Sequence, residues 1–361
     1  MFDPFKFLKQ QISPHYLGVD IGTTSIKIVE VDQGKQLPRI LNYALLESQS
    51  SLSRANVALQ TSSLKLFEEE TANLLQSALK KMKPRTKEAV ASLPVFSAFT
   101  TVLSFPEMSA ADLQKTLAYQ AKQYIPLPIS EVAMDWLKVG SYEDDKGFKF
   151  QQVLLISVPQ EQIKKYQQIF RKAGLSLGAL EIEGLSLVRS LIGNDPTPTM
   201  ILDIGSRSTS ITVADKGELR FSSQSDYAGS SLTQAVSSAL SINPLRAEEM
   251  KRERGISGSG PNYELSTIML PFLDVIINEV KRAEFSYHSQ FPIAGKIERM
   301  IVSGGGANLL GIEKYMSGQL ERPVVKANPL LRFEYPSVLE PLAPELNPML
   351  SVALGLTLRQ F

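Results

Sequence analysis

The chain has 361 residues, of which 43% are hydrophobic and 21% are charged, and its formal net charge is +1. This size predicts more than one hydrophobic core and therefore two or more domains, and the near-zero charge gives no indication of a nucleic-acid partner. The absence of cysteine excludes disulfides and cysteine-ligated metals, and without a long apolar run or a signal peptide we expect a cytoplasmic protein.

The first candidate site follows the apolar run from Tyr16 to Val19. That run ends in Asp20, Ile21 and Gly22 and then resumes as an alternating β-branched segment, which predicts a β-hairpin with a tight turn. Glycine allows backbone N–H groups to approach a polyphosphate, and Asp20 at the strand end is placed to hold Mg²⁺ through water. Further hydroxyl donors in this turn are Thr23, Thr24 and Ser25.

Residues 87–173 follow a different pattern from the segments on either side of them. The strands are expected at 89–93, 99–105, 132–139 and 148–158, and the helices at 109–122 and 161–172. Ser109 and Asp112 have the spacing of a helix capping box, and the segment from Asp144 to Gly147 is typical of a hairpin turn. We therefore expect an inserted α+β subdomain.

The first motif returns in the second half of the chain. Asp203-Ile204-Gly205-Ser206 repeats Asp20-Ile21-Gly22-Thr23 at a distance of 183 residues, and Ser208 adds a further hydroxyl. A single copy is typical of an ordinary hairpin, but a duplicated turn at one register favours two related halves. Two such hairpins facing each other would clamp the phosphates of a nucleotide, with one metal ion shared by Asp20 and Asp203.

A long helical pattern and a third glycine motif follow. Residues 264–288 have apolar side chains at helical spacing, and Phe285 is expected among the buried ones. Met300 to Val302 then lead into Gly304, Gly305 and Gly306. Bare backbone there can lie flat against a base or ribose, although a glycine triplet is equally typical of a loop that needs positive φ.

In this order and at these distances, the three motifs resemble the phosphate-1, phosphate-2 and adenosine motifs of the actin, Hsp70 and sugar-kinase superfamily. The resemblance spans nearly the whole chain. It implies an α/β, actin-like, two-lobed fold of ribonuclease-H type that binds ATP and Mg²⁺ between its lobes. It also implies that Asp20 and Asp203 organise the metal, that Lys27 contacts phosphate, and that Gly304 to Gly306 contact adenosine.

Two further sites follow from the same resemblance. The segment after Ala247 resembles the Ala-Glu-x-x-Lys element of the division protein FtsA, which implies that Glu248 and Lys251 contact the ribose or base. A solvated charged helix face is the other interpretation of these two residues.

The connection between the halves carries a candidate catalytic residue. Glu183 matches the place where the superfamily has a water-orienting Glu or Gln, which implies that Glu183 and Asp203 support a weak ATPase activity. The superfamily pattern continues with proline, whereas Gly184 follows here. Glu183 is also typical of the acidic first turn of a helix.

The position of the insertion resembles FtsA and the PilM family of type IV pilus assembly rather than actin or Hsp70. We expect a first lobe of residues 1–86, 174–195 and 350–361, an inserted subdomain of residues 87–173, and a second lobe of residues 196–349. The PilM resemblance implies a cytoplasmic protein, peripheral to the inner membrane, that binds the N-terminal cytoplasmic tail of PilN. Other pilus platform proteins and further copies of the chain, as a homo-oligomer, are additional expected partners.

Two alternatives share this fold. An FtsA-like division protein would carry a long linker and a C-terminal amphipathic helix, whereas this chain stops after its last expected core helix. A small-molecule kinase would need a general-base carboxylate aimed at a substrate hydroxyl, and no residue stands out for that role. The pattern therefore favours the pilus-assembly interpretation.

Overall fold

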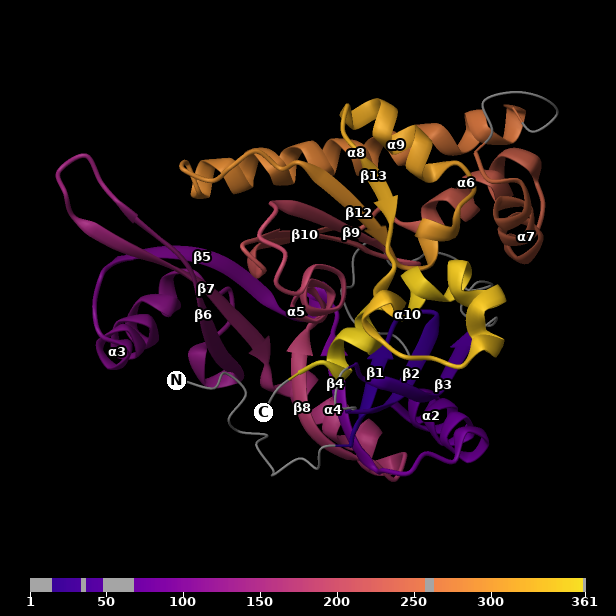
Figure 1. The fold of residues 1–361 in the computed structure, drawn as a ribbon, viewed down its shortest axis with the longest axis horizontal. Coiled ribbons are helices and arrows are strands. Elements are labelled where there is room, and N and C mark those ends of the chain that lie inside the picture. Colours follow the sequence, from indigo (N-terminus) through magenta and orange to yellow (C-terminus); the bar gives the residue numbers. More distant parts are fainter. Residues whose placement is uncertain (1–14, 34–36, 48–67, 257–262, 360–361) are drawn as a thin grey trace.

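Three β-sheets organise the chain in the computed structural model, which describes residues 15–33, 37–47, 68–256 and 263–359 (Figure 1). Two five-stranded sheets have the orders β3-β2-β1-β4-β8 and β11-β10-β9-β12-β13, and the third sheet has the order β5-β7-β6. In both five-stranded sheets, three strands form an antiparallel meander, and two more strands run parallel to the first strand of that meander, β1 or β9. The shared topology confirms the two related halves expected from the repeat.

The first lobe is built on one of these sheets, with helices on both faces. Its strands are β1 (Leu17–Ile21), β2 (Ser25–Asp32), β3 (Arg39–Glu47), β4 (Glu88–Leu93) and β8 (Ser176–Ile182). Helices α2 (Glu68–Met82) and α4 (Gln160–Lys172) pack on β3 and β8. Helices α5 (Glu183–Leu187) and α10 (Ala343–Thr357) lie between this sheet and the second lobe.

The second lobe repeats the arrangement with different helices. Its strands are β9 (Thr199–Ile204), β10 (Thr209–Asp215), β11 (Glu218–Ser225), β12 (Arg299–Ser303) and β13 (Val324–Lys326). Its helices are α6 (Gly229–Leu240), α7 (Pro244–Arg254), α8 (Tyr263–Gln290) and α9 (Ile312–Leu320). None of the helices in the described ranges has both the length and the apolar composition needed to cross a membrane.

The insertion is a small two-layer subdomain made of a three-stranded sheet and a helix. Strands β5 (Phe99–Pro106), β6 (Val132–Glu143) and β7 (Lys149–Pro159) carry α3 (Ala110–Gln120) on one face. Leu113 and Leu117 of the helix pack with Val153 and Leu155 of the central strand. The side chain of Ser109 accepts a hydrogen bond from the backbone of Asp112, so the expected cap begins this helix. The expected α+β insertion is confirmed.

The strand pairing gives this insertion other boundaries than those expected from the sequence. Strand β4 pairs with β1 and β8, so a boundary at residue 87 wrongly assigns it to the insertion, which begins after Leu93. Helix α4 packs on α2 and β8, so it also covers the first lobe. The final helix begins at Ala343, before the segment 350–361 that was expected to belong to the first lobe, and the proline in its first turn is tolerated there.

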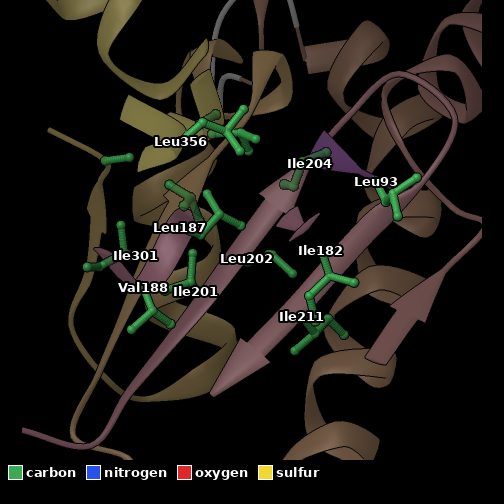
Figure 2. Close-up of a cluster of buried hydrophobic side chains, with 14 of the residues drawn as sticks. Leu93, Ile182, Leu187, Val188, Ile201, Leu202, Ile204, Ile211, Ile301 and Leu356 are labelled. Atoms are coloured by element: carbon green, nitrogen blue, oxygen red, sulfur yellow. The ribbon is translucent and has the colours of Figure 1, made fainter. Parts of the chain in front are cut away.

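The two five-stranded sheets share one hydrophobic core below the cleft. Figure 2 shows Leu93 and Ile182 of the first sheet close to Leu202 and Ile211 of the second, with Leu187 of α5 in the same cluster. All five side chains are at most 1% exposed. A continuous core of this kind fixes the strand ends that carry the polar motifs.

The end of α10 is held by a tyrosine from the start of the first lobe. The buried hydroxyl of Tyr16 lies 2.6 Å from the Arg359 carbonyl oxygen and 3.1 Å from that of Thr357. We expect Tyr16→Phe to lower the free energy of unfolding by about 1–2 kcal/mol, because helix-end carbonyls lose a buried donor. Urea unfolding checks this, with Tyr119→Phe as control because Tyr119 is 74% exposed. Equal stability of the two variants would contradict the capping role.

Candidate functional site

The two glycine turns have the same internal hydrogen bond. The Gly22 N–H donates to the Ser25 carbonyl at 2.9 Å, and the Gly205 N–H donates to the Ser208 carbonyl at 3.0 Å. A Cβ at Gly22 or Gly205 would lie 3.1 Å or 2.9 Å from the same carbonyl oxygens. The turns therefore need glycine for their tightness, and the N–H groups of these two glycines serve the turn itself.

Both turns border one cleft of about 60 Å³ between the lobes. The expected residues that line it are Asp20, Gly22, Thr23, Thr24, Ser25, Lys27, Glu183, Asp203, Gly205, Ser206 and Ser208. Pro94, Phe96 and Ser210 complete the lining. The structure thus brings the two repeated motifs and the connector together.

Both carboxylate oxygens of Asp20 have partners. Oδ2 lies 3.0 Å from the Lys27 ammonium, and Oδ1 accepts a hydrogen bond from the Ser92 hydroxyl at 2.9 Å. Burial by itself lowers the pKa of Lys27. The charge and hydrogen bond of Asp20, followed by the smaller effects of Asp203 and Glu183, raise that pKa above its ordinary value. Lys27 is therefore held in its charged form beside the first-lobe aspartate.

Asp203 has a different environment. It lies on β9 opposite Ser210 of β10 and beside Ser303 of β12. Burial raises the pKa of Asp203 to about 6; the Ser303 hydrogen bond opposes this shift and the charge of Asp20 adds to it. The Ser303 hydroxyl also lies 3.2 Å from the Pro348 carbonyl oxygen, and its one proton can serve only one of these two acceptors.

Glu183 is the third carboxylate of the cleft and the first residue of α5. Burial, followed by the charges of Asp20 and Asp203, raises the pKa of Glu183 well above its ordinary value, while the Val95 N–H donates to the carboxylate. With Lys27, the charged residues lining the cleft carry a net charge of −2 when all are ionised. Such a site attracts a cation and resists a bare polyphosphate.

Glu248 and Lys251 lie on α7, and neither lines this cleft. The Lys251 ammonium contacts the Glu248 carboxylate at 2.6 Å, the Thr233 hydroxyl at 2.9 Å and the Gly229 carbonyl at 3.1 Å. Gly229 begins α6, and its N–H donates to the Gly205 carbonyl. The pair thus supports the helix that holds the second turn, and its contact with a ribose or base remains a prediction.

The glycine triplet lies beside the second turn. A Cβ at Gly304, which has φ +77°, would lie 2.5 Å from the Ile204 carbonyl oxygen, and one at Gly306 would lie 2.4 Å from the Ile204 side chain. Both glycines are therefore required by packing against the end of β9. A Cβ at Gly305 would meet no atom within 4 Å, so this residue presents open backbone. Its contact with adenosine stays a prediction.

Comparison with known families and structures bears directly on this geometry. The family described as type IV pilus assembly protein PilM matches residues 18–361. The chain belongs to the PilM family. This membership favours the pilus-assembly interpretation over the division-protein and kinase alternatives.

Solved structures agree with the fold of a PilM-family protein. The chain is similar to the PilM–PilN type IV pilus biogenesis complex, with a TM-score of 0.78 and 23% identity over 95% of this chain and 98% of that one. It is also similar to the ethanolamine utilization protein EutJ of Carboxydothermus hydrogenoformans (TM-score 0.57, 17% identity, 98% and 93% covered). A third likeness is to MreB5 of Spiroplasma citri bound to AMPPNP (TM-score 0.55, 12% identity, 95% of each chain). The actin-like α/β fold is confirmed.

Sequence reasoning missed the cleft residue Ser210 and several residues that act on the carboxylates of the cleft in this PilM-family chain. Ser92 and Ser303 each follow an apolar strand run and contact the aspartate of their own lobe. Ser210 is the repeat equivalent of Lys27, and this register was readable from the sequence. Tyr166 of α4 is 1% exposed, and burial, then Glu183 and Asp20, raises its pKa. The sequence around Tyr166 gave no local signal, because the apolar pattern of a helix face is the same whether or not carboxylates of another element lie near it.

Proposed function

We propose that this PilM-family protein binds ATP with Mg²⁺ between its lobes and, in the cytoplasm at the inner membrane, holds the N-terminal cytoplasmic tail of PilN for type IV pilus assembly. The observation that carries the nucleotide part is the convergence of two repeated glycine turns on one cleft. The observation that carries the pilus part is family membership over residues 18–361.

The residues of the cleft fit a magnesium nucleotide. When all its charged residues are ionised the cleft lining has a net charge of −2, so a polyphosphate needs a cation to enter it in that state. In the described part of the chain, no group of three or more His, Cys, Asp or Glu side chains is placed to chelate a metal by itself. This suits Mg²⁺, which binds through one or two carboxylates, waters and substrate phosphates, and which when bound neutralises the phosphate oxygens.

Each side chain then has a defined role. Asp203 and Asp20, which line the cleft from the two lobes, would hold the cation, and Lys27 would contact phosphate from β2. The hydroxyl groups of the two turns donate to phosphate oxygens. The open backbone at Gly305 and the charged pair Glu248 and Lys251 lie on the adenosine side.

Glu183 orients the hydrolytic water in this proposal. Burial first, and then the charges of Asp20 and Asp203, raise its pKa and make it a weak acceptor, and a cation between the aspartates would offset the second of these causes. Turnover is therefore slow and depends on a filled cation site. This gives an ATPase whose nucleotide state lasts long enough to control a partner.

The PilN tail binds a groove that involves the insertion. Large apolar side chains remain exposed on the insertion, among them Tyr119 at 74% and Phe148 at 63%. The insertion contacts the second lobe, since the Arg220 guanidinium donates to the Val139 carbonyl. If ATP and the tail favour the same lobe arrangement, each strengthens binding of the other by the same factor.

Calorimetry with ATP, Mg²⁺ and a synthetic PilN-tail peptide tests the proposal. We expect both ligands to bind, and the peptide affinity to rise when ATP and Mg²⁺ are present. Failure of both ligands to bind would falsify the proposed function. Phosphate transfer from ATP to a panel of sugars would instead support the kinase alternative.

A further inference from the structure

The first glycine turn lies beside the last residue of β3. Ser25, whose carbonyl accepts the Gly22 N–H, pairs with Glu47 in the register of β2 and β3. Opposite residues of an antiparallel pair are close neighbours. Glu47 therefore lies next to the first turn, on the edge strand of the first lobe's sheet.

The second glycine turn is supported by α6 and α7. The Gly229 N–H at the start of α6 donates to the Gly205 carbonyl at 3.1 Å. The ammonium of Lys251 on α7 has three oxygen partners, which belong to Gly229, Thr233 and Glu248. An ammonium has three protons, so these contacts use all of them. Lys251 therefore acts on the second turn through Gly229.

Arg252 of α7 joins these two supports across the lobes. Its Nε lies 2.8 Å from the Glu248 carboxylate, and its two terminal nitrogens lie 3.3 Å from the two carboxylate oxygens of Glu47. The contact with Glu47 is bidentate, which adds geometric specificity to the attraction. Because Arg252 belongs to the second lobe and Glu47 to the first, the guanidinium spans the two lobes.

We propose that Glu47, Arg252, Glu248 and Lys251 form an interlobe latch, which fixes the distance between the two glycine turns, and that they are thereby positioning residues of the nucleotide site. This rests on the proposed function and deepens it, because the latch then controls how fast a nucleotide leaves. Glu248 and Lys251 act in the latch through Gly229 and need no contact with the ribose or base.

The part of the latch that crosses the lobes is an ion pair in contact with solvent. The side chain of Arg252 is 55% exposed and that of Glu47 is 42% exposed. Ion pairs of this kind change an equilibrium by up to about fivefold, because water and salt screen them. A latch of this strength holds the lobes together and still opens for exchange.

Release of a fluorescent ADP in the presence of Mg²⁺, followed by stopped-flow fluorescence, tests the latch. Glu47→Gln and Arg252→Gln should each speed release by about two- to fivefold. The double variant should release ADP no faster than Arg252→Gln alone, because both changes break the same contact. A direct effect of these charges on the phosphates would instead have opposite signs, since loss of an anion slows release and loss of a cation speeds it.

A second ion pair on the same helix supplies the matched control. Arg246 and Glu249 contact each other at 3.0 Å within α7, and this pair does not cross the lobes. Arg246→Gln and Glu249→Gln should therefore release ADP at the native rate. Native-like thermal unfolding of all variants shows that they fold.

A readout without nucleotide separates the latch from the proposed function. The chain has no cysteine, so spin labels can be attached specifically at Lys80→Cys on α2 and Ala239→Cys on α6, two exposed positions in different lobes. Double electron–electron resonance of the ligand-free chain should show a longer or broader distance distribution with Glu47→Gln than without it. Should the native chain bind no ADP while this distribution changes, the nucleotide proposal falls and the latch stands.

The opposite results overturn the inference. It fails if Glu47→Gln slows ADP release or leaves the rate native, or if the effects of Glu47→Gln and Arg252→Gln add in the double variant. An unchanged distance between the labelled lobes of the ligand-free chain overturns it as well.

Discussion

Asp203→Asn is expected to weaken Mg²⁺-dependent nucleotide binding strongly and, at the same time, to stabilise the ligand-free protein at neutral pH. Binding should fall by about a hundredfold, because the amide keeps the shape and loses the charge that is proposed to hold the cation. The free energy of unfolding should rise on the order of 2 kcal/mol, because burial raises the pKa of Asp203 to about 6 and its ionised form is therefore costly. Calorimetry with ADP and Mg²⁺ and urea unfolding in EDTA measure the two effects.

The stability gain has a defined dependence on pH. The Asp203 carboxyl titrates at about 6 in the folded chain and at its ordinary value of 3.8 when unfolded. A raised carboxyl pKa gives stability that is present below the unfolded value and lost as pH rises through the folded one. The native protein and the variant should therefore be similarly stable near pH 4, diverge as the pH rises from 4 to about 6, and differ by a constant amount above that.

Asp195→Asn is the control with the opposite sign. Hydrogen bonds from Thr197, with Arg299 beside them, lower the pKa of Asp195 to about 2. Asp195 thus contributes stability that is present above pH 3.8 and lost as pH falls through 2, so its asparagine variant should be less stable at neutral pH. A ligand-free Asp203→Asn protein less stable than the native one at pH 7.5 would contradict the cost assigned to the buried charge.

The repeat made the fold predictable, because a turn duplicated at one register implies two sheets of one topology. The elements of the insertion were also readable, since alternation and capping are local signals, as at Ser109. Strand β4 was assigned to the wrong part because its apolar run is the same whichever sheet it joins, and pairing with β1 is not local. Sheet membership depends on distant partners, which a single sequence does not display.

The prediction of which side chains are buried was wrong at one position of the long helix α8. Phe285 was expected inside α8 and is 75% exposed, whereas Ala283 and Tyr287 are buried. Phe285 follows Val280 by five residues, which places it well off the buried face of a 3.6-residue helix. The glycine triplet shows a related limit, because packing requires glycine at Gly304 and leaves open space at Gly305, and the sequence does not distinguish the two positions.

Gly355→Ala is expected to destabilise the protein more than any other single methyl group added to α10. A Cβ at Gly355 would lie 2.0 Å from the Ser186 carbonyl oxygen of α5, and a Cβ at Gly18 of β1 would lie 2.2 Å from the Ala353 carbonyl oxygen. Both contacts are with backbone, so no side chain can move aside. We expect a loss of at least about 3 kcal/mol in the free energy of unfolding, measured with urea.

Gly318→Ala is the matched control, because its Cβ meets no atom within 4 Å and it lies in the exposed part of α9. The free energy of unfolding of that variant should rise by about 0.5–1 kcal/mol from helix propensity.

Helix α10 also contacts the glycine loop of the second lobe. The Gly304 N–H donates to the Pro348 carbonyl at 2.9 Å, so α10 joins the core of the first lobe to that loop. If the added methyl group of Gly355→Ala displaces α10 from β1 and α5, nucleotide binding should therefore weaken even in molecules that remain folded. Native stability and native ADP affinity in Gly355→Ala would show that α10 is not packed this closely and does not couple the lobes.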